Sequence, residues 1–309
     1  MRKVQGFGRR IAGAWLAVVV GMLATGTSMA GEPAAYQVGT LKVEQYGNHG
    51  RPVILIPGLS SGAWVWKDTV TALEKDHVVY AVTLAGFDGT PAPKGGGNYL
   101  AQAESSVIEL IRTRKLDKPV LVGHSVGGTL ALKIASEQPR LLGAAVSVDG
   151  LPVFPMSENM TAAQRTQMAT GMQAKMAAAT PAQFQAQQLG YMQKIGVIDP
   201  KKAETYARLS ARSDAKAVAQ YMAEDFALNF RDRMKNADIP VLLVSPYYAA
   251  DGAASPQPFS EAQKTAYWTS LLGPAPHAKV VSISPARHFV MLDQPEKFQQ
   301  VLGDFLRSL

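Results

Sequence analysis

The residues best suited to chemistry in this sequence form the segment Gly123-His-Ser-Val-Gly127. An apolar run, residues 120–122, precedes this segment, and a stretch typical of a helix, residues 128–135, follows it. A G-x-S-x-G sequence between a strand and a helix is typical of a nucleophile elbow, a sharp turn that exposes a serine hydroxyl. The alternative is a tight packing turn in which the serine only fills a small space. We interpret Ser125 as a candidate nucleophile.

A serine hydroxyl is a weak nucleophile, and it needs a base within hydrogen-bond reach, normally a histidine that a carboxylate holds in place. The chain order that accompanies this kind of turn is serine, acid, histidine, and only His277 and His288 come late enough to fit it. His277 precedes the last apolar run, residues 280–283, whereas His288 follows it. Catalytic groups gather at the carboxyl ends of parallel strands. We therefore predict that His288 is the base; a buried structural histidine is the alternative.

Short apolar runs alternate with helical stretches from residue 36 onward, which predicts an α/β fold with a mostly parallel, eight-stranded sheet flanked by helices. The predicted strands cover residues 36–38, 41–46, 53–56, 78–82, 120–122, 144–148, 241–244 and 280–283. The predicted helices lie near residues 63–75, 99–114, 127–138, 260–272 and 295–309. The first two strands are expected to form a hairpin.

One segment interrupts this alternation. Residues 152–238 contain no run typical of a strand, and they hold eight of the twelve methionines, so we predict a helical insertion after the sixth strand. Met168, Met172 and Met176 are spaced four residues apart and therefore share one face of a helix. This face either packs in the core of the insertion or lines an apolar substrate pocket, and the two interpretations are compatible.

The first 30 residues resemble a secretory signal peptide, with basic residues, an apolar run over residues 11–24 and small residues before Ala30. Cleavage after Ala30 would lower the formal net charge from +7 to +3, because the removed segment holds four basic residues and no acidic one. We therefore expect no nucleic-acid partner, and an exported protein, periplasmic or secreted, without a stable membrane anchor. An uncleaved anchor is the alternative, although the apolar run is shorter than the roughly 20 residues of a spanning helix.

The chain contains no cysteine, which excludes thiol catalysis and cysteine-based metal sites. Any nucleophile must then be a hydroxyl, a carboxylate or an amine. The chemistry expected of a serine nucleophile requires neither a metal nor an organic cofactor.

Four segments together resemble the α/β-hydrolase superfamily: residues 56–64 (IPGLSSGAW), 84–87 (LAGF), 123–128 (GHSVGG) and 287–296 (RHFVMLDQPE). The resemblance covers about residues 36–151 and 239–309. It implies an α/β-hydrolase fold, with a core formed by residues 31–151 and 239–309 and a helical cap formed by residues 152–238. It also implies an oxyanion hole built from the backbone N–H groups of Leu59 and Val126.

Two residues compete for the role of the acid. Asp251 follows the seventh predicted strand, which is the commoner place for the acid in serine-bearing members of the superfamily, but it lies about two residues late in a loop. Asp149 ends the sixth predicted strand, where some capped relatives carry their acid, and a strand end holds a side chain more rigidly than a loop does. We favour Asp149 and keep Asp251 as the alternative. Asp149 could also simply cap the turn into the insertion.

The expected reaction is cleavage of a small or medium apolar carboxylic ester through an acyl-enzyme on Ser125. Trp64, Met168, Met172 and Tyr247 are the candidate residues of the substrate pocket, because apolar and aromatic side chains line most small-molecule sites. Cleavage of a lactone or a carbon–carbon bond by the same three residues is an alternative, because one fold serves many reactions. A non-catalytic exported protein that binds an apolar ligand is a further alternative.

Overall fold

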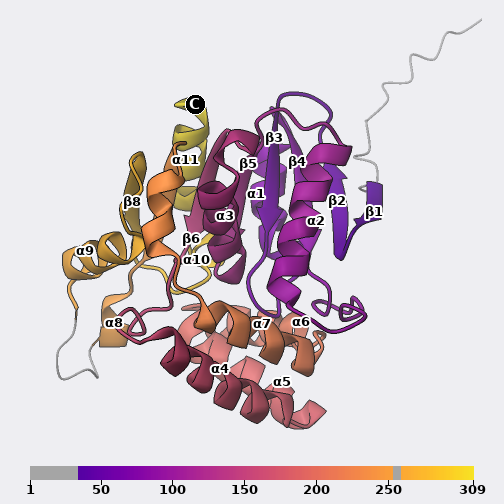
Figure 1. The fold of residues 1–309 in the computed structure, drawn as a ribbon, viewed down its shortest axis with the longest axis vertical. Coiled ribbons are helices and arrows are strands. Elements are labelled where there is room, and N and C mark those ends of the chain that lie inside the picture. The colour runs from indigo at the N-terminus through magenta and orange to yellow at the C-terminus, as the bar shows by residue number, and fades with distance from the viewer. Residues whose placement is uncertain (1–33, 253–258) are drawn as a thin grey trace, which may run out of the picture. The chain divides into compact units, whose positions relative to one another are not determined.

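The computed structural model describes residues 34–252 and 259–309 (Figure 1). The predicted signal peptide therefore lies outside the described residues. Eight strands form one sheet in the order β1-β2-β4-β3-β5-β6-β7-β8, antiparallel between β1 and β2 and between β2 and β4, and parallel elsewhere. The strands are β1 (Ala34–Val38), β2 (Leu41–Tyr46), β3 (Arg51–Ile56), β4 (His77–Thr83), β5 (Val120–His124), β6 (Ala144–Val148), β7 (Val241–Pro246) and β8 (Ala278–Ile283). The predicted eight-stranded, mostly parallel sheet is confirmed.

Helices cover both faces of this sheet. Buried residues of α2, α3 and α9 pack in one hydrophobic cluster with one face of the sheet, and those of α1, α10 and α11 pack with the other. Figure 1 shows α2 and α3 in front of the strands. The bounds of these helices are α1 (Lys67–Leu73), α2 (Tyr99–Thr113), α3 (Val126–Glu137), α9 (Glu261–Leu272), α10 (Val290–Asp293) and α11 (Pro295–Arg307), with the short α8 (Ala249–Gly252) after β7.

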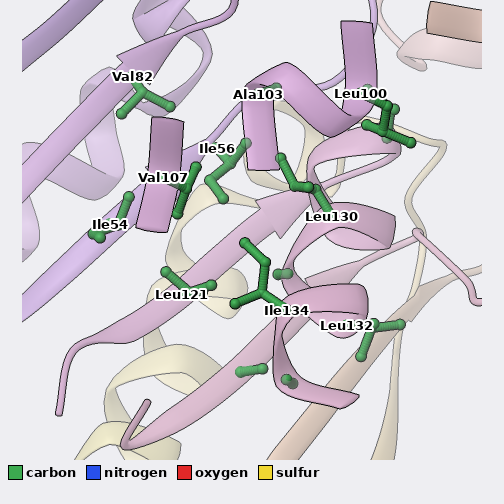
Figure 2. Packing of buried hydrophobic residues seen from close by; sticks show 14 of the residues in the cluster. Ile54, Ile56, Val82, Leu100, Ala103, Val107, Leu121, Leu130, Leu132 and Ile134 are labelled. Atoms are coloured by element: carbon green, nitrogen blue, oxygen red, sulfur yellow. The ribbon is translucent and has the colours of Figure 1, made fainter. Parts of the chain in front are cut away.

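The central strands are buried on both faces, which explains why their sequences are continuous apolar runs and do not alternate with polar residues. Every residue of β5, β6 and β7 is buried. Figure 2 shows strand side chains such as Ile56 and Leu121 pointing toward Val107 of α2 and Ile134 of α3. This packing holds the end of each parallel strand in place, and so it also determines the position of the residues that follow each strand.

The segment between β6 and β7, which we call the cap, is helical. Its helices are α4 (Ala162–Ala177), α5 (Pro181–Tyr191), α6 (Pro200–Ser210) and α7 (Ala215–Ala227), with a π-helical turn at Met192–Gly196 and a 3-10 helix at Arg231–Asn236. Capping boxes begin α4 at Thr161 and α5 at Thr180, each with a glutamine three residues later. Figure 1 shows α4 to α7 together at one end of the strands.

The cap helix α7 is tied to the core by a carboxylate. Glu224 accepts hydrogen bonds from the backbone N–H groups of Tyr99 (2.9 Å) and Leu100 (2.7 Å), the first two residues of α2. These N–H groups have no partner inside their own helix, so a carboxylate there accepts their hydrogen bonds and is also attracted by the positive end of the helix.

Within the described ranges, no helix is long and apolar enough to cross a membrane.

Candidate active site

Ser125 occupies a strained turn between β5 and α3. Its φ of 53° and ψ of −124° lie in a region that residues other than glycine rarely adopt. The Ser125 N–H donates to the carbonyl of Val148 at the end of β6 (2.9 Å), which holds the turn against the neighbouring strand. The serine thus lies at the carboxyl end of the sheet and at the N-terminus of α3.

Two glycines allow other segments to approach this turn. A Cβ on Gly150 would lie 2.3 Å from the carbonyl oxygen of Ser125, so no side chain fits where the chain leaves β6. A Cβ on Gly58 would lie 2.9 Å from the Cβ of Ser125. The loop after β3 is therefore pressed against the serine, and the next residue, Leu59, lines the same cavity as Ser125. Val126 is the first residue of α3, where backbone N–H groups lack partners within the helix.

His288 and Asp149 form a hydrogen-bonded pair beside this turn. The Nδ1 atom of His288 lies 2.6 Å from Oδ2 of Asp149, and the other carboxylate oxygen, Oδ1, accepts a hydrogen bond from Nε1 of Trp268 (2.9 Å). Asp149 directly follows β6 and has a positive φ of 52°, a conformation costly for a residue other than glycine. His288 follows β8, as the sequence order requires.

The environment of Asp149 keeps its carboxyl ionised. Burial alone would raise its pKa, but the hydrogen bond and charge of His288, the charge of Lys264 and the hydrogen bond from Trp268 together hold the pKa below its ordinary value. A carboxylate in this position fixes the proton of His288 on Nδ1 and leaves Nε2 free to act as a base.

Asp251, the alternative acid, is paired with a different residue. It lies in α8 and accepts hydrogen bonds from the guanidinium of Arg287, the shortest of them 2.6 Å long. Arg287 also donates to the carbonyls of Gln193 (2.7 Å) and Val197 (3.1 Å) in the cap. The structure therefore brings Asp149, and not Asp251, to His288.

The loop that carries His288 is also attached to the cap. The His288 N–H donates to the carbonyl of Ile195 (3.1 Å), and the next N–H, of Phe289, donates to Gly196 (3.0 Å). Both carbonyls belong to the π-helical turn, so backbone hydrogen bonds join the cap to the loop that carries His288. This turn was not foreseen from the sequence.

His124, the variable residue of the serine motif, holds the backbone of His288. It is fully buried, and its Nε2 donates to the backbone carbonyl of His288 (3.0 Å). Burial and the nearby ring of His288 lower the pKa of His124 well below its ordinary value, so it is neutral. The roles of His124 and Trp268 were not predicted from the sequence. The position of His124 directly before Ser125 was a signal that could have pointed to it. No pattern in the sequence pointed to Trp268.

A cavity of about 510 Å³ lies between the core and the cap and contains Ser125, His288 and Asp149 in its wall. Most of the remaining wall is apolar, including Leu151, Val153, Phe154, Met176, Ile195, Val218 and Met222. The accessible surface of the cavity is therefore suited to an apolar group bound next to the serine.

The four residues predicted to form the pocket lie outside the wall of this cavity, so that prediction is corrected. Trp64 stacks on Tyr206 with ring centroids 5.4 Å apart, and the hydroxyl of Tyr247 donates to the carbonyl of Phe259. Met168 is largely exposed, and Met172 packs in a small cluster inside the cap. The predicted methionine face reaches the cavity only one turn later, at Met176.

No group of three or more side chains that could hold a metal ion occurs within the described part of the chain.

Comparisons with known proteins show the family of the chain. The sequence model described as "Alpha/beta hydrolase family" matches residues 53–301. A curated relative, the 1-acylglycerol-3-phosphate O-acyltransferase ABHD5 of Rattus norvegicus, is 24% identical over 293 residues, which cover 84% of this chain and 78% of that protein.

Two solved structures have a similar fold. A thermophilic esterase from Thermogutta terrifontis matches with a TM-score of 0.70 at 18% identity, over 89% of this chain and 98% of that one. The enol-lactonase from Burkholderia xenovorans LB400 matches with a TM-score of 0.63 at 19% identity, over 89% of this chain and all of the other.

Proposed function

Because this chain belongs to the alpha/beta hydrolase family, we propose that it is a serine hydrolase that cleaves small or medium carboxylic esters through an acyl-enzyme. The observation that carries the proposal is the hydrogen bond of 2.6 Å between His288 and Asp149 beside the strained Ser125. A hydroxyl nucleophile is activated by a nearby base that a carboxylate orients, and here the serine lies in a strained turn beside such a pair.

In the proposed mechanism, the Oγ of Ser125 attacks the ester carbonyl while Nε2 of His288 takes the hydroxyl proton. The carbonyl oxygen becomes an oxyanion, and the N–H groups of Leu59 and Val126 donate hydrogen bonds to it. Each such donor can contribute about 3–4 kcal/mol to the transition state. Asp149 stabilises the imidazolium that forms on His288.

Collapse of the tetrahedral intermediate breaks the carbon–oxygen bond to the alcohol, and His288 returns its proton to the departing oxygen. A water molecule then attacks the acyl group on Ser125, with His288 as the base again. Hydrolysis of the acyl-enzyme releases the carboxylic acid and restores the hydroxyl of Ser125. The chemistry uses groups of this chain and water, with the proton held in turn by serine, histidine and the leaving alcohol.

The cavity supports the size and polarity proposed for the substrate. Its volume of about 510 Å³ is in the range of small-molecule sites, and its wall is mostly apolar. We propose an acyl group of short to medium length against this apolar wall.

We also propose that the protein is exported to the periplasm or the medium and acts after removal of residues 1–30. The basic residues, the apolar run and the small residues before Ala30 support this proposal. N-terminal sequencing of the protein from separated cell fractions tests it; a cytoplasmic protein that retains Met1 would contradict it.

The experiment that tests the enzymatic proposal is hydrolysis of p-nitrophenyl acetate, butyrate and octanoate by residues 31–309, with Ser125→Ala assayed beside the wild type. We expect turnover that the substitution abolishes, with butyrate preferred over octanoate. Equal rates for the two proteins, or no turnover by either, would contradict the proposal.

A further inference from the structure

A second carboxyl group faces the cavity, and the proposed reaction does not use it. Asp225 belongs to α7 of the cap and lines the same cavity as Ser125 and His288. It lies near Thr129, which is one helical turn after Ser125 in α3 and whose hydroxyl donates to the carbonyl of Leu151 (3.2 Å). Asp225 is therefore close to the place where a substrate carbonyl would bind.

The position of this carboxyl is unfavourable for an isolated anion. Asp225 lies in the last turn of α7, where the backbone carbonyls form the negative end of the helix. Its side chain is partly exposed, and the burial of the remainder raises its pKa to about 7, although the hydroxyl of Thr129 and the charge of His288 act in the opposite direction. An ionisable side chain that faces a cavity and has a shifted pKa is a candidate functional group.

The charged residues near Asp225 already have other partners. Arg165 of α4 lies beside the end of α7, but it donates to the carbonyls of Ala227 (3.3 Å) and Met160 (2.5 Å). Glu224 accepts hydrogen bonds from the start of α2.

On the opposite wall of the cavity, His288 is paired with Asp149. The phenol of Tyr191 also lines the cavity, and burial raises its pKa, so it is neutral. Within the described residues, Asp225 makes no ion pair, and no lysine or arginine lines the cavity. The space left for a cation beside Asp225 is the cavity itself.

We propose that Asp225 is a specificity-determining residue that selects esters carrying a positively charged nitrogen a few bonds from the scissile carbonyl. The proposal rests on the proposed esterase function and names its substrate class. A bound ammonium would supply the missing counter-charge of the carboxylate. The aromatic side chains of Phe154, Tyr191 and Trp268 also line the cavity, and aromatic faces attract such a cation.

Asp225 is held in a defined place, which a specificity determinant requires. Its neighbour Glu224 fixes α7 to the core, and the carbonyl of Asp225 accepts the N–H of Leu228 (3.1 Å) at the end of the helix. These contacts anchor the backbone that carries Asp225 at the wall of the cavity.

The test compares two esters of equal shape: the choline ester of butyric acid and 3,3-dimethylbutyl butyrate, in which carbon replaces the charged nitrogen. For the wild type, we expect kcat/KM to be about tenfold or more higher for the choline ester, which corresponds to one favourable charge pair. Asp225→Asn should abolish this preference, because it lowers kcat/KM for the choline ester about tenfold more than kcat/KM for the neutral ester.

The pH dependence adds an independent readout. The ratio of the two kcat/KM values cancels every pH dependence that the two esters share. In the wild type this ratio should rise with pH through about 7, as Asp225 loses its proton. In Asp225→Asn the ratio should be independent of pH. Asp304→Asn, which removes an exposed carboxylate, is the control and should retain the wild-type ratio.

Equal rates for the two esters in the wild type, or an equal loss of both rates in Asp225→Asn, would overturn the proposal. Binding of the choline ester to Ser125→Ala, measured by calorimetry, separates this proposal from the proposed function because it needs no turnover. We expect Kd to increase about tenfold when Asp225→Asn is added to Ser125→Ala. An unchanged Kd would refute the role of Asp225, whereas failure of both esters to turn over, with the expected increase in Kd, would refute the esterase alone.

Discussion

The Nδ1 atom of His288 lies 2.6 Å from Oδ2 of Asp149, and this hydrogen bond joins the loop after β8 to the end of β6. The two residues are 139 positions apart in the chain. Between their strands lies β7, whose following segment holds Asp251 in an ion pair with Arg287. Asp149 and Asp251 therefore have different partners, and we expect their substitution to have different effects on kcat.

Asp149→Asn should lower kcat by about 10³–10⁴-fold, because the amide no longer stabilises the imidazolium and can hold the wrong tautomer of His288. Asp251→Asn should lower kcat by less than about threefold, since it breaks a partly exposed ion pair away from the base. Steady-state hydrolysis of p-nitrophenyl butyrate by both variants checks this. A large loss confined to Asp251→Asn would assign the acid to the other residue.

Trp268→Phe should lower kcat/KM by about tenfold, because it removes the hydrogen bond of 2.9 Å to Oδ1 of Asp149 while it keeps an aromatic ring in place. Trp64→Phe is the matched control: the indole N–H of Trp64 is buried without a protein partner, and its ring lies outside the cavity. This variant should retain kcat/KM within about twofold. Equal losses in the two variants would indicate a general effect on packing.

Gly58→Ala should lower kcat by about 10²-fold, since its new methyl group would lie 2.6 Å from Nδ1 of His124 and 2.9 Å from the Cβ of Ser125. The loop that carries Leu59 would have to move away from the serine. Gly171→Ala, on an exposed helix with open space around it, is the control and should increase the unfolding free energy by up to about 1 kcal/mol. Full activity of Gly58→Ala would contradict the placement of the oxyanion hole beside this glycine.

Asp225→Asn should stabilise the protein at neutral pH and not at acidic pH. The pKa of Asp225 is raised from an ordinary value of 3.8 to about 7, so the unfolded chain loses this proton at a lower pH than the folded protein does. The carboxyl therefore costs stability increasingly as pH rises from about 4 to 7, by up to about 4 kcal/mol, and the cost persists above pH 7.

Thermal unfolding of wild type and Asp225→Asn between pH 4 and 8 measures this cost. We expect nearly equal Tm values at pH 4 and a higher Tm for the variant at pH 8, while Asp304→Asn follows the wild type throughout. A difference in Tm that does not depend on pH would mean that Asp225 titrates normally.

Much of the fold could be read from the sequence because each central strand is a continuous apolar run and each flanking helix has a clear periodic pattern. The strand 144–148 was predicted with its observed ends. Ser125 and His288 were also reachable, since a short motif marks the first and chain order limits the second. The structure brings both into one cavity.

The sequence favoured Asp149 as the acid but left Asp251 as an alternative, because the two residues follow neighbouring strands. What separates them is Arg287, which pairs with Asp251 and adjoins His288 in the chain. That contact depends on the fold of the cap and of α8. Sequence analysis also missed Asp225, because an acidic residue in a helix is normally exposed and only packing against α3 places it in the cavity.

The pocket prediction failed for a similar reason. An aromatic residue near a predicted site, or a methionine on a helix face, can pack in a hydrophobic core as readily as it can line a substrate pocket. Trp64 is held by Tyr206, and Met172 by the cap's own cluster, so neither is free to face the cavity. The side chains that do so, such as Met176 and Met222, differ from their neighbours only in their position relative to the core.

The most direct test of the account is covalent labelling of the nucleophile. Residues 31–309 are incubated with a fluorophosphonate, and the intact protein and its peptides are examined by mass spectrometry, with Ser125→Ala and His288→Ala alongside. We predict one adduct per chain, on the peptide that contains Ser125, absent from Ser125→Ala and formed much more slowly in His288→Ala. An unlabelled wild type, or an adduct on a different residue, would contradict it.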